Sequence, residues 1–366
     1  MKDSHVDAWE RIFDLCYQRA SGASDKLQNF TGWKSSYSMG SIPADEMREW
    51  VRETVDRILE GKPRNIYEIG AGVGLIMFPL LDRCKSYCAT DLSREAVEYL
   101  KKHTPGGREG VSYYQRPADD LGDVEVGKYE TFVLNSVVQY FPSIEYLERV
   151  IEGIMNCIGG EGVIFLGDIR DHRLLKHFHS SVAIYQAEDG TDPTTLRKNI
   201  EKRIANDSEL TLDPDFFIGL KSKHPQISHI EMRLKRGMVQ NELTKFRYDV
   251  LIYLGKSSPP QWSKIEWDRD EKRLLGEAEK HGGRFQIVNI PNFSVLGIDE
   301  SIKLIDSGED LDIQKLKALN DFGQARAEWE ALYSLFSSGY RVEPILDASD
   351  PVKFSLYVEK SQCFDS

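Results

Sequence analysis

Short apolar runs alternate with amphipathic segments through residues 61–170, and this alternation is the dominant pattern of the chain. Apolar runs of this length, bounded by polar or glycine-rich turns, are typical of buried strands. We predict five strands, at 65–69, 87–91, 111–115, 129–134 and 163–167. Helices are predicted between them, at 75–81, 93–103 and 143–157. Strands and helices that alternate in this way indicate an α/β fold with a doubly wound parallel sheet.

The pattern changes on both sides of this core. Residues 1–60 hold two amphipathic helices, which we predict to form an N-terminal cap over the ligand site; plain core packing of their apolar sides is an equal alternative. Residues 171–225 are predicted to be a helical lid insertion. Two long strand patterns in 226–255 predict an antiparallel hairpin at the sheet edge. Residues 256–366 show no catalytic cluster, so we predict a C-terminal accessory subdomain there.

A glycine turn connects the first predicted strand to the first helix, in the order Glu68-Ile69-Gly70-Ala71-Gly72-Val73-Gly74-Leu75. Such a turn brings backbone N–H groups and a helix N-terminus beside a ligand. A dinucleotide fingerprint would need its third glycine at position 75, which is Leu75. The Glu68 carboxylate would repel a pyrophosphate but would pair with the ammonium group of S-adenosylmethionine. The alternative is a glycine turn that binds no ligand.

Two further acidic positions have spacings that suit an adenosine. Asp91 ends the second strand, 21 residues after Gly70, where a carboxylate can hydrogen-bond ribose hydroxyls. The alternative for Asp91 is a helix N-cap, and both roles can coexist. Asp119 follows the third strand and could accept a hydrogen bond from the adenine amino group, with a solvated loop as the alternative.

Polar side chains also follow the fourth and fifth strands. They are Asn135-Ser136-Val137-Val138-Gln139-Tyr140-Phe141-Pro142 after the fourth strand and Asp168-Ile169-Arg170 after the fifth. In open α/β sheets the ligand lies outside the carboxyl ends of the strands. We therefore expect side chains from these two segments to touch the substrate.

Composition narrows the classes of partner. The 366 residues are 40% apolar and carry a net charge of −12, which argues against a nucleic-acid partner held by general electrostatics. No apolar run approaches the ~20 residues that a membrane span needs, and the polar residues 1–8 do not read as a signal peptide. The five cysteines are odd in number and scattered. We therefore predict no metal site and a reduced, cytoplasmic setting.

Several segments together resemble one family, the S-adenosylmethionine-dependent N-methyltransferase domains of nonribosomal peptide synthetases. They are 31–37 (Thr31-Gly32-Trp33-Lys34-Ser35-Ser36-Tyr37), 46–51, 68–72, 135–142, 167–170, 235–237, 241–250 and 290–292. The resemblance spans nearly the whole chain, and segments 135–142 and 241–250 are specific to this family. It implies a class I methyltransferase with a Rossmann-like sheet, an antiparallel last strand, and S-adenosylmethionine converted to S-adenosylhomocysteine.

The resemblance and the sheet-edge positions together predict the site residues. The cofactor-binding set is Tyr37, Met47, Glu68, Gly70, Gly72, Asp91, Leu92, Ala118, Asp119, Asn135 and Ser136. Glu242 is our first candidate for the base or ammonium anchor, and Asp168 is the second. Asn135, Gln139 and Tyr140 are predicted to orient the acceptor amine and the methyl group. The substrate-binding set is Arg170, Arg236, His177 and Trp33, with His177 and His179 as weaker base candidates.

The chain departs from the family in one respect, because we find neither an adenylation sequence nor a carrier-type serine motif beside the methyltransferase segments. A free amino acid or small amine is therefore a predicted acceptor, alongside an aminoacyl group on a peptidyl carrier protein. The pathway implied is natural-product biosynthesis. A guanidine nitrogen is a variant acceptor that would need paired carboxylates, which Glu242 and Asp168 could supply.

Three other functions stay open on the sequence. An O- or C-methyltransferase would share the whole cofactor half of the chain, and only the product would separate it. A catalytically silent domain would keep Glu68, Gly70 and Asp91 but would tolerate loss of Glu242. An NAD-dependent oxidoreductase is disfavoured by Leu75 and Glu68.

Overall fold

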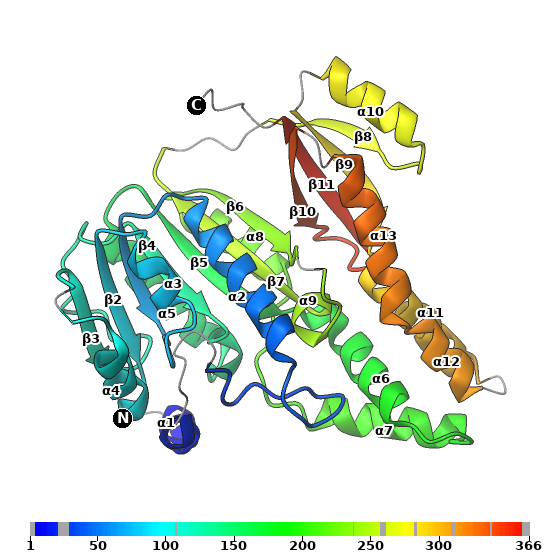
Figure 1. Ribbon diagram of the computed structural model, residues 1–366, viewed down its shortest axis with the longest axis horizontal. Coiled ribbons are helices and arrows are strands. Elements are labelled where there is room, and N and C mark those ends of the chain that lie inside the picture. The colour runs from blue at the N-terminus through cyan, green and yellow to red at the C-terminus, as the bar shows by residue number, and fades with distance from the viewer. Residues whose placement is uncertain are drawn as a thin grey trace.

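The computed structural model describes residues 4–20, 29–106, 108–236, 238–256, 261–281, 284–308, 312–336 and 339–360. Residues 1–3 and Gly237, which belong to segments discussed above, lie outside the described residues. The described strands form one 11-stranded sheet in the order β3-β2-β1-β4-β5-β7-β6-β10-β11-β9-β8 (Figure 1). The strands are β1 (Asn65–Ile69), β2 (Ser86–Asp91), β3 (Val111–Gln115), β4 (Thr131–Asn135), β5 (Gly162–Arg170), β6 (Ile227–Leu234), β7 (Arg247–Leu254), β8 (Ser263–Glu266), β9 (Arg284–Pro291), β10 (Tyr340–Leu346) and β11 (Lys353–Lys360).

The first five strands form the parallel sheet that the alternating pattern predicts. β1 pairs in parallel with both β2 and β4, and β7 runs antiparallel to β5. The predicted fold class, a doubly wound sheet with an antiparallel last strand, is therefore confirmed. The strand order reverses between β1 and β4, and such a switch point opens a ligand crevice at the carboxyl ends of the strands.

Helices cover both faces of this half of the sheet. Successive strand residues point to opposite faces, so Ile66 and Tyr67 enter two different apolar clusters. The cluster of Ile66 holds side chains of α2 (Ala44–Leu59), α3 (Met77–Leu81) and α4 (Arg94–His103). The cluster of Tyr67 holds side chains of α5 (Ile144–Ile158) and α8 (Asp215–Lys223). Burial on both faces explains why these strands read as continuous apolar runs.

The insertion after β5 is helical, as predicted. It begins with η3 (His172–Leu174) and contains α6 (Leu175–Gln186), α7 (Pro193–Ala205) and α8. An apolar cluster joins α6 and α7 to α11 (Phe293–Ser307) and α12 (Ile313–Leu319), so these four helices pack against one another (Figure 1). Among the described helices, none has the length and apolar character to cross a bilayer.

The C-terminal strands extend the sheet, and this corrects one expectation. β6 and β7 do pair as an antiparallel hairpin, but the prediction that the hairpin lies at the sheet edge is wrong. β6 also meets β10 through Arg233 and Ile345, and β11, β9 and β8 follow. An open strand edge carries unpaired N–H and C=O groups, and β10 covers the end of the β6 edge near Arg233. The helices α10 (Glu271–Lys280) and α13 (Phe322–Leu335) complete this part.

A buried network of charges connects the C-terminal part to the N-terminal helix and the core. Arg57 on α2 pairs with Asp249 on β7 at 2.5 Å and with Glu343 on β10 at 2.7 Å. Asp249 also pairs with Lys235 at 2.6 Å and accepts the backbone N–H of Asp168 at 2.8 Å. Ion pairs thus join α2, β7 and β10. The hydrogen bond from the Asp168 N–H to Asp249 attaches the end of β5 to the same network.

Candidate active site

The first cavity lies at the switch point, where β1, β2 and β4 end. The glycine turn forms part of its wall, and Gly70 and Gly72 have φ angles of 75° and 53°, which favour glycine. Side chains would also not fit, because a Cβ on Gly70 would lie 2.4 Å from Val137 and one on Gly72 would lie 2.9 Å from the Tyr17 hydroxyl. The turn therefore lets the backbone approach whatever occupies the cavity.

Asp91 lies in the wall of this cavity with its carboxylate held in place. One oxygen accepts the backbone N–H of Gly72 at 2.8 Å, and the other accepts that of Ser93 at 2.8 Å. Burial raises the pKa of Asp91 to about 6, against the opposing effect of these two hydrogen bonds. The N-cap of α4 is Ser93, whose side chain accepts from Ala96, so the N-cap alternative for Asp91 is wrong. Asp91 keeps lone pairs that can accept hydroxyl groups.

Glu68 lies behind the turn. It is buried, and its carboxylate accepts the Tyr87 hydroxyl at 2.7 Å. Burial raises the pKa of Glu68 to about 7; the Tyr87 hydrogen bond lowers it and the Asp91 charge raises it further. Glu68 is not among the described residues that line the cavity. Direct pairing with an ammonium group stays a prediction, and the described hydrogen bond of the carboxylate joins β1 to Tyr87 of β2.

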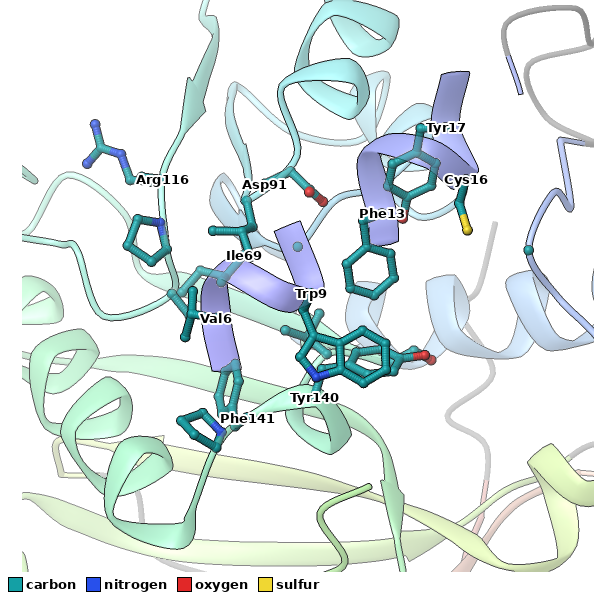
Figure 2. Close-up of a pocket in the computed structure, with 18 of the residues that line it drawn as sticks. Val6, Trp9, Phe13, Cys16, Tyr17, Ile69, Asp91, Arg116, Tyr140 and Phe141 are labelled. Carbon is teal, nitrogen blue, oxygen red and sulfur yellow. The ribbon is translucent and has the colours of Figure 1, made fainter. Parts of the chain in front are cut away.

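An aromatic wall from α1 (Ser4–Ala20) covers the cavity (Figure 2). The Trp9 and Phe13 rings lie 4.5 Å and 5.1 Å from that of Tyr140, and the Phe13 ring stacks on Tyr17 at 6.0 Å. Asp14 accepts the Ser93 hydroxyl at 2.5 Å and ties α1 to the start of α4. The cap that the sequence predicts therefore closes the cavity with aromatic faces.

These features fit S-adenosylmethionine. Asp91 could accept ribose hydroxyls, the glycine turn allows close approach, and aromatic faces favour a sulfonium cation. Leu92, Ala118 and Ser136 line the cavity as predicted.

Other predicted cofactor residues lie elsewhere. Asp119 is exposed and accepts the Tyr146 hydroxyl at 2.9 Å, although Tyr146 itself lines the cavity. Met47 is fully buried in the α2 cluster, and the Tyr37 hydroxyl lies 2.5 Å from that of Ser181. Tyr37 and Met47 are not among the described residues that line the cavity, so the structure does not bring them to it. Asn135 ends β4, and its buried amide oxygen has no hydrogen-bond partner in the described part of the chain.

A second cavity adjoins the first and shares Gly32, Trp33 and Tyr140 with it. Gln139 and Glu242 line the second of these two cavities and are not described lining residues of the first. Trp33 and Tyr140 therefore lie where the two cavities meet. The roles of Trp33, Gln139 and Tyr140 near the reacting groups stay predictions.

Glu242 is presented to the second cavity by a loop distant in sequence. It begins the short helix α9 (Glu242–Lys245), and only 6% of its surface is exposed. Its carboxylate accepts the Ser36 N–H at 3.0 Å, the Ser36 hydroxyl at 2.9 Å and the Ser35 hydroxyl at 3.3 Å. Asn241 caps α9 by accepting the Leu243 N–H at 2.9 Å. The carboxylate is thus fixed by three donor groups, and about one of its roughly four lone-pair sites is left for a ligand.

Asp168 has a different role from the one predicted. It lies in the left-handed region with φ of 69° and is paired with Arg247 at 2.7 Å and Lys235 at 3.2 Å. Burial acts to raise the pKa of Asp168, but the charges of Lys235 and Arg247 hold it at about 2. Such a carboxylate is a poor base, and Asp168 is not among the described residues that line either cavity. The structure therefore contradicts Asp168 as the second base candidate, and among the described residues Glu242 and Asp168 do not line one cavity together.

Asp168 nevertheless forms a hydrogen bond with a residue that lines the first cavity. It accepts the Ser136 hydroxyl at 2.6 Å and the Trp50 indole N–H at 3.3 Å. Ser136 itself lines the first cavity and also has a left-handed φ, of 56°. Asp168 therefore positions Ser136.

The two arginines predicted to bind substrate are paired with carboxylates. Arg170 lines the second cavity, but its guanidinium donates to both oxygens of Asp207, at 2.9 Å and 2.6 Å. Arg236 pairs with Glu60 and Glu343 and is not among the described residues that line either cavity. The prediction for Arg236 is wrong, because its guanidinium pairs with Glu343 on β10. The sequence analysis did not place that strand beside Arg236.

Of the two α6 histidines predicted as weaker base candidates, the structure brings His179 to the second cavity, whereas His177, also predicted to bind substrate, is not among its described lining residues. His177 packs against Asp299, 3.3 Å away, and is not a described lining residue of the second cavity. His179 does line that cavity, with Nε2 2.8 Å from Asp207. Residues two apart on a helix point to different sides, so only one of them could face the site. Burial acts to raise the pKa of Asp207, but hydrogen bonds from Arg170 and His179 hold it well below its usual range.

Two site residues have roles that we did not predict, Arg247 and Asp207. Arg247 begins β7, and because β7 is antiparallel to β5, its start lies at the same edge as the end of β5. That signal was available in the sequence. Asp207 follows α7 in the insertion and has no comparable signal, since only the fold brings it to Arg170.

Comparison with known proteins agrees with this geometry. Residues 67–164 match the model of a methyltransferase domain family. The chain is 41% identical over 280 residues to chondramide synthase of Chondromyces crocatus, covering 76% of this chain and 7% of that protein. It is 35% identical over 267 residues to the nonribosomal peptide synthetase TES of Alternaria alternata, covering 70% of this chain and 5% of that protein. The chain thus spans a small fraction of the length of these relatives.

Among solved structures, the N-methyltransferase NodS of Bradyrhizobium japonicum, in complex with S-adenosylhomocysteine, aligns with a TM-score of 0.42 and 14% identity. The alignment covers 66% of this chain and 98% of that chain.

The sheet order, the glycine turn and the matched domain together define an S-adenosylmethionine-dependent methyltransferase. The chain belongs with the methyltransferase domains of nonribosomal peptide synthetases, and the resemblance read from its sequence is confirmed. S-adenosylmethionine is its cofactor.

Proposed function

We propose that this chain transfers a methyl group to a nitrogen of an amino acid or an amino-acid-derived small molecule. The observation that carries the proposal is the buried Glu242 carboxylate in the wall of the second cavity, which adjoins the cofactor cavity at Trp33 and Tyr140. A carboxylate at this place suits an acceptor that arrives as a cation. An amine is such an acceptor, whereas a hydroxyl group is not.

S-adenosylmethionine, when bound, supplies a methyl group already activated on a sulfonium. The remaining work for the chain is to orient the acceptor and to remove its proton. An α-amine has a reference pKa of about 8, so much of it is protonated at neutral pH. Glu242 would hold the ammonium group and accept the proton that leaves, while Ser36 keeps the carboxylate in place. Trp33, Gln139 and Tyr140 would orient the amine towards the first cavity.

We infer that the acceptor belongs to natural-product biosynthesis and is either free or bound to a peptidyl carrier protein. The sequence identity to two nonribosomal peptide synthetases supports this class of acceptor, because such enzymes join amino acids.

The test is mass spectrometry after incubation with isotopically labelled S-adenosylmethionine. One set of reactions holds free amino acids and small amines, and the other holds aminoacyl carrier proteins. Label on the nitrogen of either kind of acceptor supports the proposal and identifies the source. Label on an oxygen or carbon atom would support the O- or C-methyltransferase alternative instead. Cofactor binding with no transfer in either set would favour a catalytically silent domain.

A further inference from the structure

Arg247 and Glu242 lie in the walls of the same cavities. Both line the second cavity, and both also line a smaller one together with Phe246. We infer that the Arg247 guanidinium donates hydrogen bonds to the acyl oxygen of the acceptor, on the carbon beside the one that bears the amine. The inference rests on the proposed function and deepens it, because it assigns a second anchor for the same acceptor.

The Arg247 guanidinium has N–H donors that the protein does not use. The residue is half-buried at the start of β7. Its Nη1 donates to Asp168 at 2.7 Å, and within the described part of the chain this is the one hydrogen bond of the side chain. A guanidinium carries five N–H donors in a fixed fork. No nitrogen of Arg247 is among the described buried atoms that lack a partner, so the remaining donors are not enclosed by protein.

Asp168 fixes this guanidinium from outside the cavity. It is fully buried and is not among the described residues that line the second cavity. Burial acts to raise the pKa of Asp168, but Lys235 and Arg247 hold it at about 2, so the carboxylate stays ionised at neutral pH. The ion pair therefore orients Arg247 and leaves its other N–H groups for a molecule in the cavity.

Most other charged groups of this cavity do not offer such an anchor. The acidic and basic side chains that line it, among the described residues, are Lys34, Arg170, His179, Glu188, Lys202, Arg203, Asp207, Glu209, Glu242 and Arg247. Arg170 pairs with both Asp207 and Glu209, at 2.6 Å and 3.2 Å, and His179 lies 2.8 Å from Asp207. These four side chains therefore satisfy one another.

The remaining members separate by burial. Those that are exposed or half-buried, apart from Arg247, are Lys34, Glu188, Lys202 and Arg203. Glu242 and Arg247 instead are each fixed, by Ser36 and by Asp168, and among the described ion pairs they do not pair with each other. Burial acts to lower the pKa of Arg247, but the charges of Asp168 and Glu242 are among those that raise it, so the two groups interact across the cavity.

An α-amino acid matches these two groups. Its amine suits the Glu242 carboxylate, and its acyl oxygen suits the Arg247 fork. A free carboxylate would accept two parallel N–H groups, whereas the carbonyl of a carrier-bound aminoacyl group offers a single oxygen. An amine without an acyl oxygen would use only one anchor. Arg247 thus takes the role of the arginine fork that the sequence analysis gave to Arg170 and Arg236.

The test compares acceptors that differ only in the acyl oxygen. Each standard amino acid is compared with the amine that lacks its carboxyl group. Each aminoacyl carrier protein is compared with a carrier whose arm ends in an aminoalkyl thioether. We expect the native chain to prefer the acyl member of one series by at least about tenfold in kcat/KM, the value of one hydrogen bond to a charged group. The series that shows the preference identifies a free or a carrier-bound acyl group.

Arg247→Lys is the variant, because lysine keeps the charge beside Asp168 but loses the fork. The preference should fall by about tenfold or more, while kcat/KM for the amine without the acyl oxygen stays close to the native value. Arg326→Lys is the matched control, since Arg326 is exposed and pairs with Glu330 on the same helix. Circular dichroism verifies that each variant is folded. An equal preference in native and Arg247→Lys protein would overturn the inference.

A binding measurement separates this inference from the proposed function. The same probes are titrated into the protein in the presence of S-adenosylhomocysteine, so no methyl transfer is needed. Tighter binding of the acyl member, lost in Arg247→Lys, supports the Arg247 anchor even if no nitrogen is methylated, and that result would count against the proposed function alone. Methyl transfer to nitrogen without any preference for the acyl member would overturn the Arg247 anchor alone. Neither binding nor transfer with any probe would overturn both.

Discussion

The Glu242 carboxylate accepts the backbone N–H of Ser36 at 3.0 Å, across 206 residues of sequence. Two segments that are far apart, 31–37 and 241–250, thus meet at the wall of the second cavity. Loops that carry function are positioned by a rigid scaffold, and here the scaffold is the edge where β5 ends and β7 begins.

Removal of the Glu242 charge should reduce turnover but not cofactor binding. We expect Glu242→Gln to lower kcat by roughly 10²–10⁴-fold, the usual contribution of a positioned proton acceptor. The dissociation constant of S-adenosylmethionine should change little, because Glu242 is not among the described residues lining the first cavity. Ser36→Ala keeps the backbone donor and should cost less. Glu279→Gln, an exposed site on α10, is the control. Native turnover in Glu242→Gln would contradict the assignment.

The aromatic face of α1 should hold the cofactor. Trp9→Ala removes a ring that lies 4.5 Å from Tyr140, and we expect S-adenosylmethionine to bind about tenfold more weakly, as for the loss of a cation–π contact. Ile12 lies on the same helix and is 46% exposed, so Ile12→Ala is the matched control. Equilibrium binding of the cofactor distinguishes the two variants. Equal affinities in both would show that α1 does not close the cavity.

The free energy of unfolding of the cofactor-free protein should fall as the pH rises from 4.5 to about 7, the two pKa values of Glu68 in the unfolded and folded states. Burial raises the pKa of Glu68 from 4.5 to about 7 in the folded chain, so the folded state binds this proton more tightly than the unfolded state. The free energy of unfolding should therefore be roughly 2–3 kcal/mol higher at pH 4.5 than at pH 7 from this group.

Glu68→Gln should remove that contribution and leave the part due to Asp91, whose pKa burial raises to about 6. Urea unfolding at the two pH values measures the difference. An unchanged pH dependence in Glu68→Gln would show that Glu68 does not carry it.

The buried charge network should be a major source of stability for the C-terminal strands. Glu343→Gln removes one partner of Arg57, which keeps Asp249, and one partner of Arg236, which keeps Glu60. We expect it to destabilise the fold by roughly 1.5–3 kcal/mol, as for the loss of a hydrogen bond between charged groups. Arg52→Ala breaks an exposed pair with Glu53 and should cost no more than about 1 kcal/mol. Urea unfolding tests both. A small effect of Glu343→Gln would mean that β10 is held by packing alone.

Local patterns predicted much of this molecule, and the misses share one cause. The five parallel strands, the glycine turn and Asp91 were accessible because apolar periodicity and short spacings determine them. Arg236, Asp168 and Arg170 were read as free side chains, yet each is paired with a residue distant in sequence. The pairing of β6 with β10 joins positions more than a hundred residues apart, and no local pattern encodes such a partner. The sequence alone therefore predicted the roles of charged residues at strand ends least well.

The measurement that tests the central claim most directly is the position of the transferred methyl group. Labelled S-adenosylmethionine is incubated with amino acids, amines and aminoacyl carrier proteins, and fragmentation of the product locates the label. Our account predicts label on a nitrogen atom, and a loss of that product when Glu242 is changed to Gln. Label on oxygen or carbon, or the same yield of N-methylated product from the Glu242→Gln variant, would contradict it.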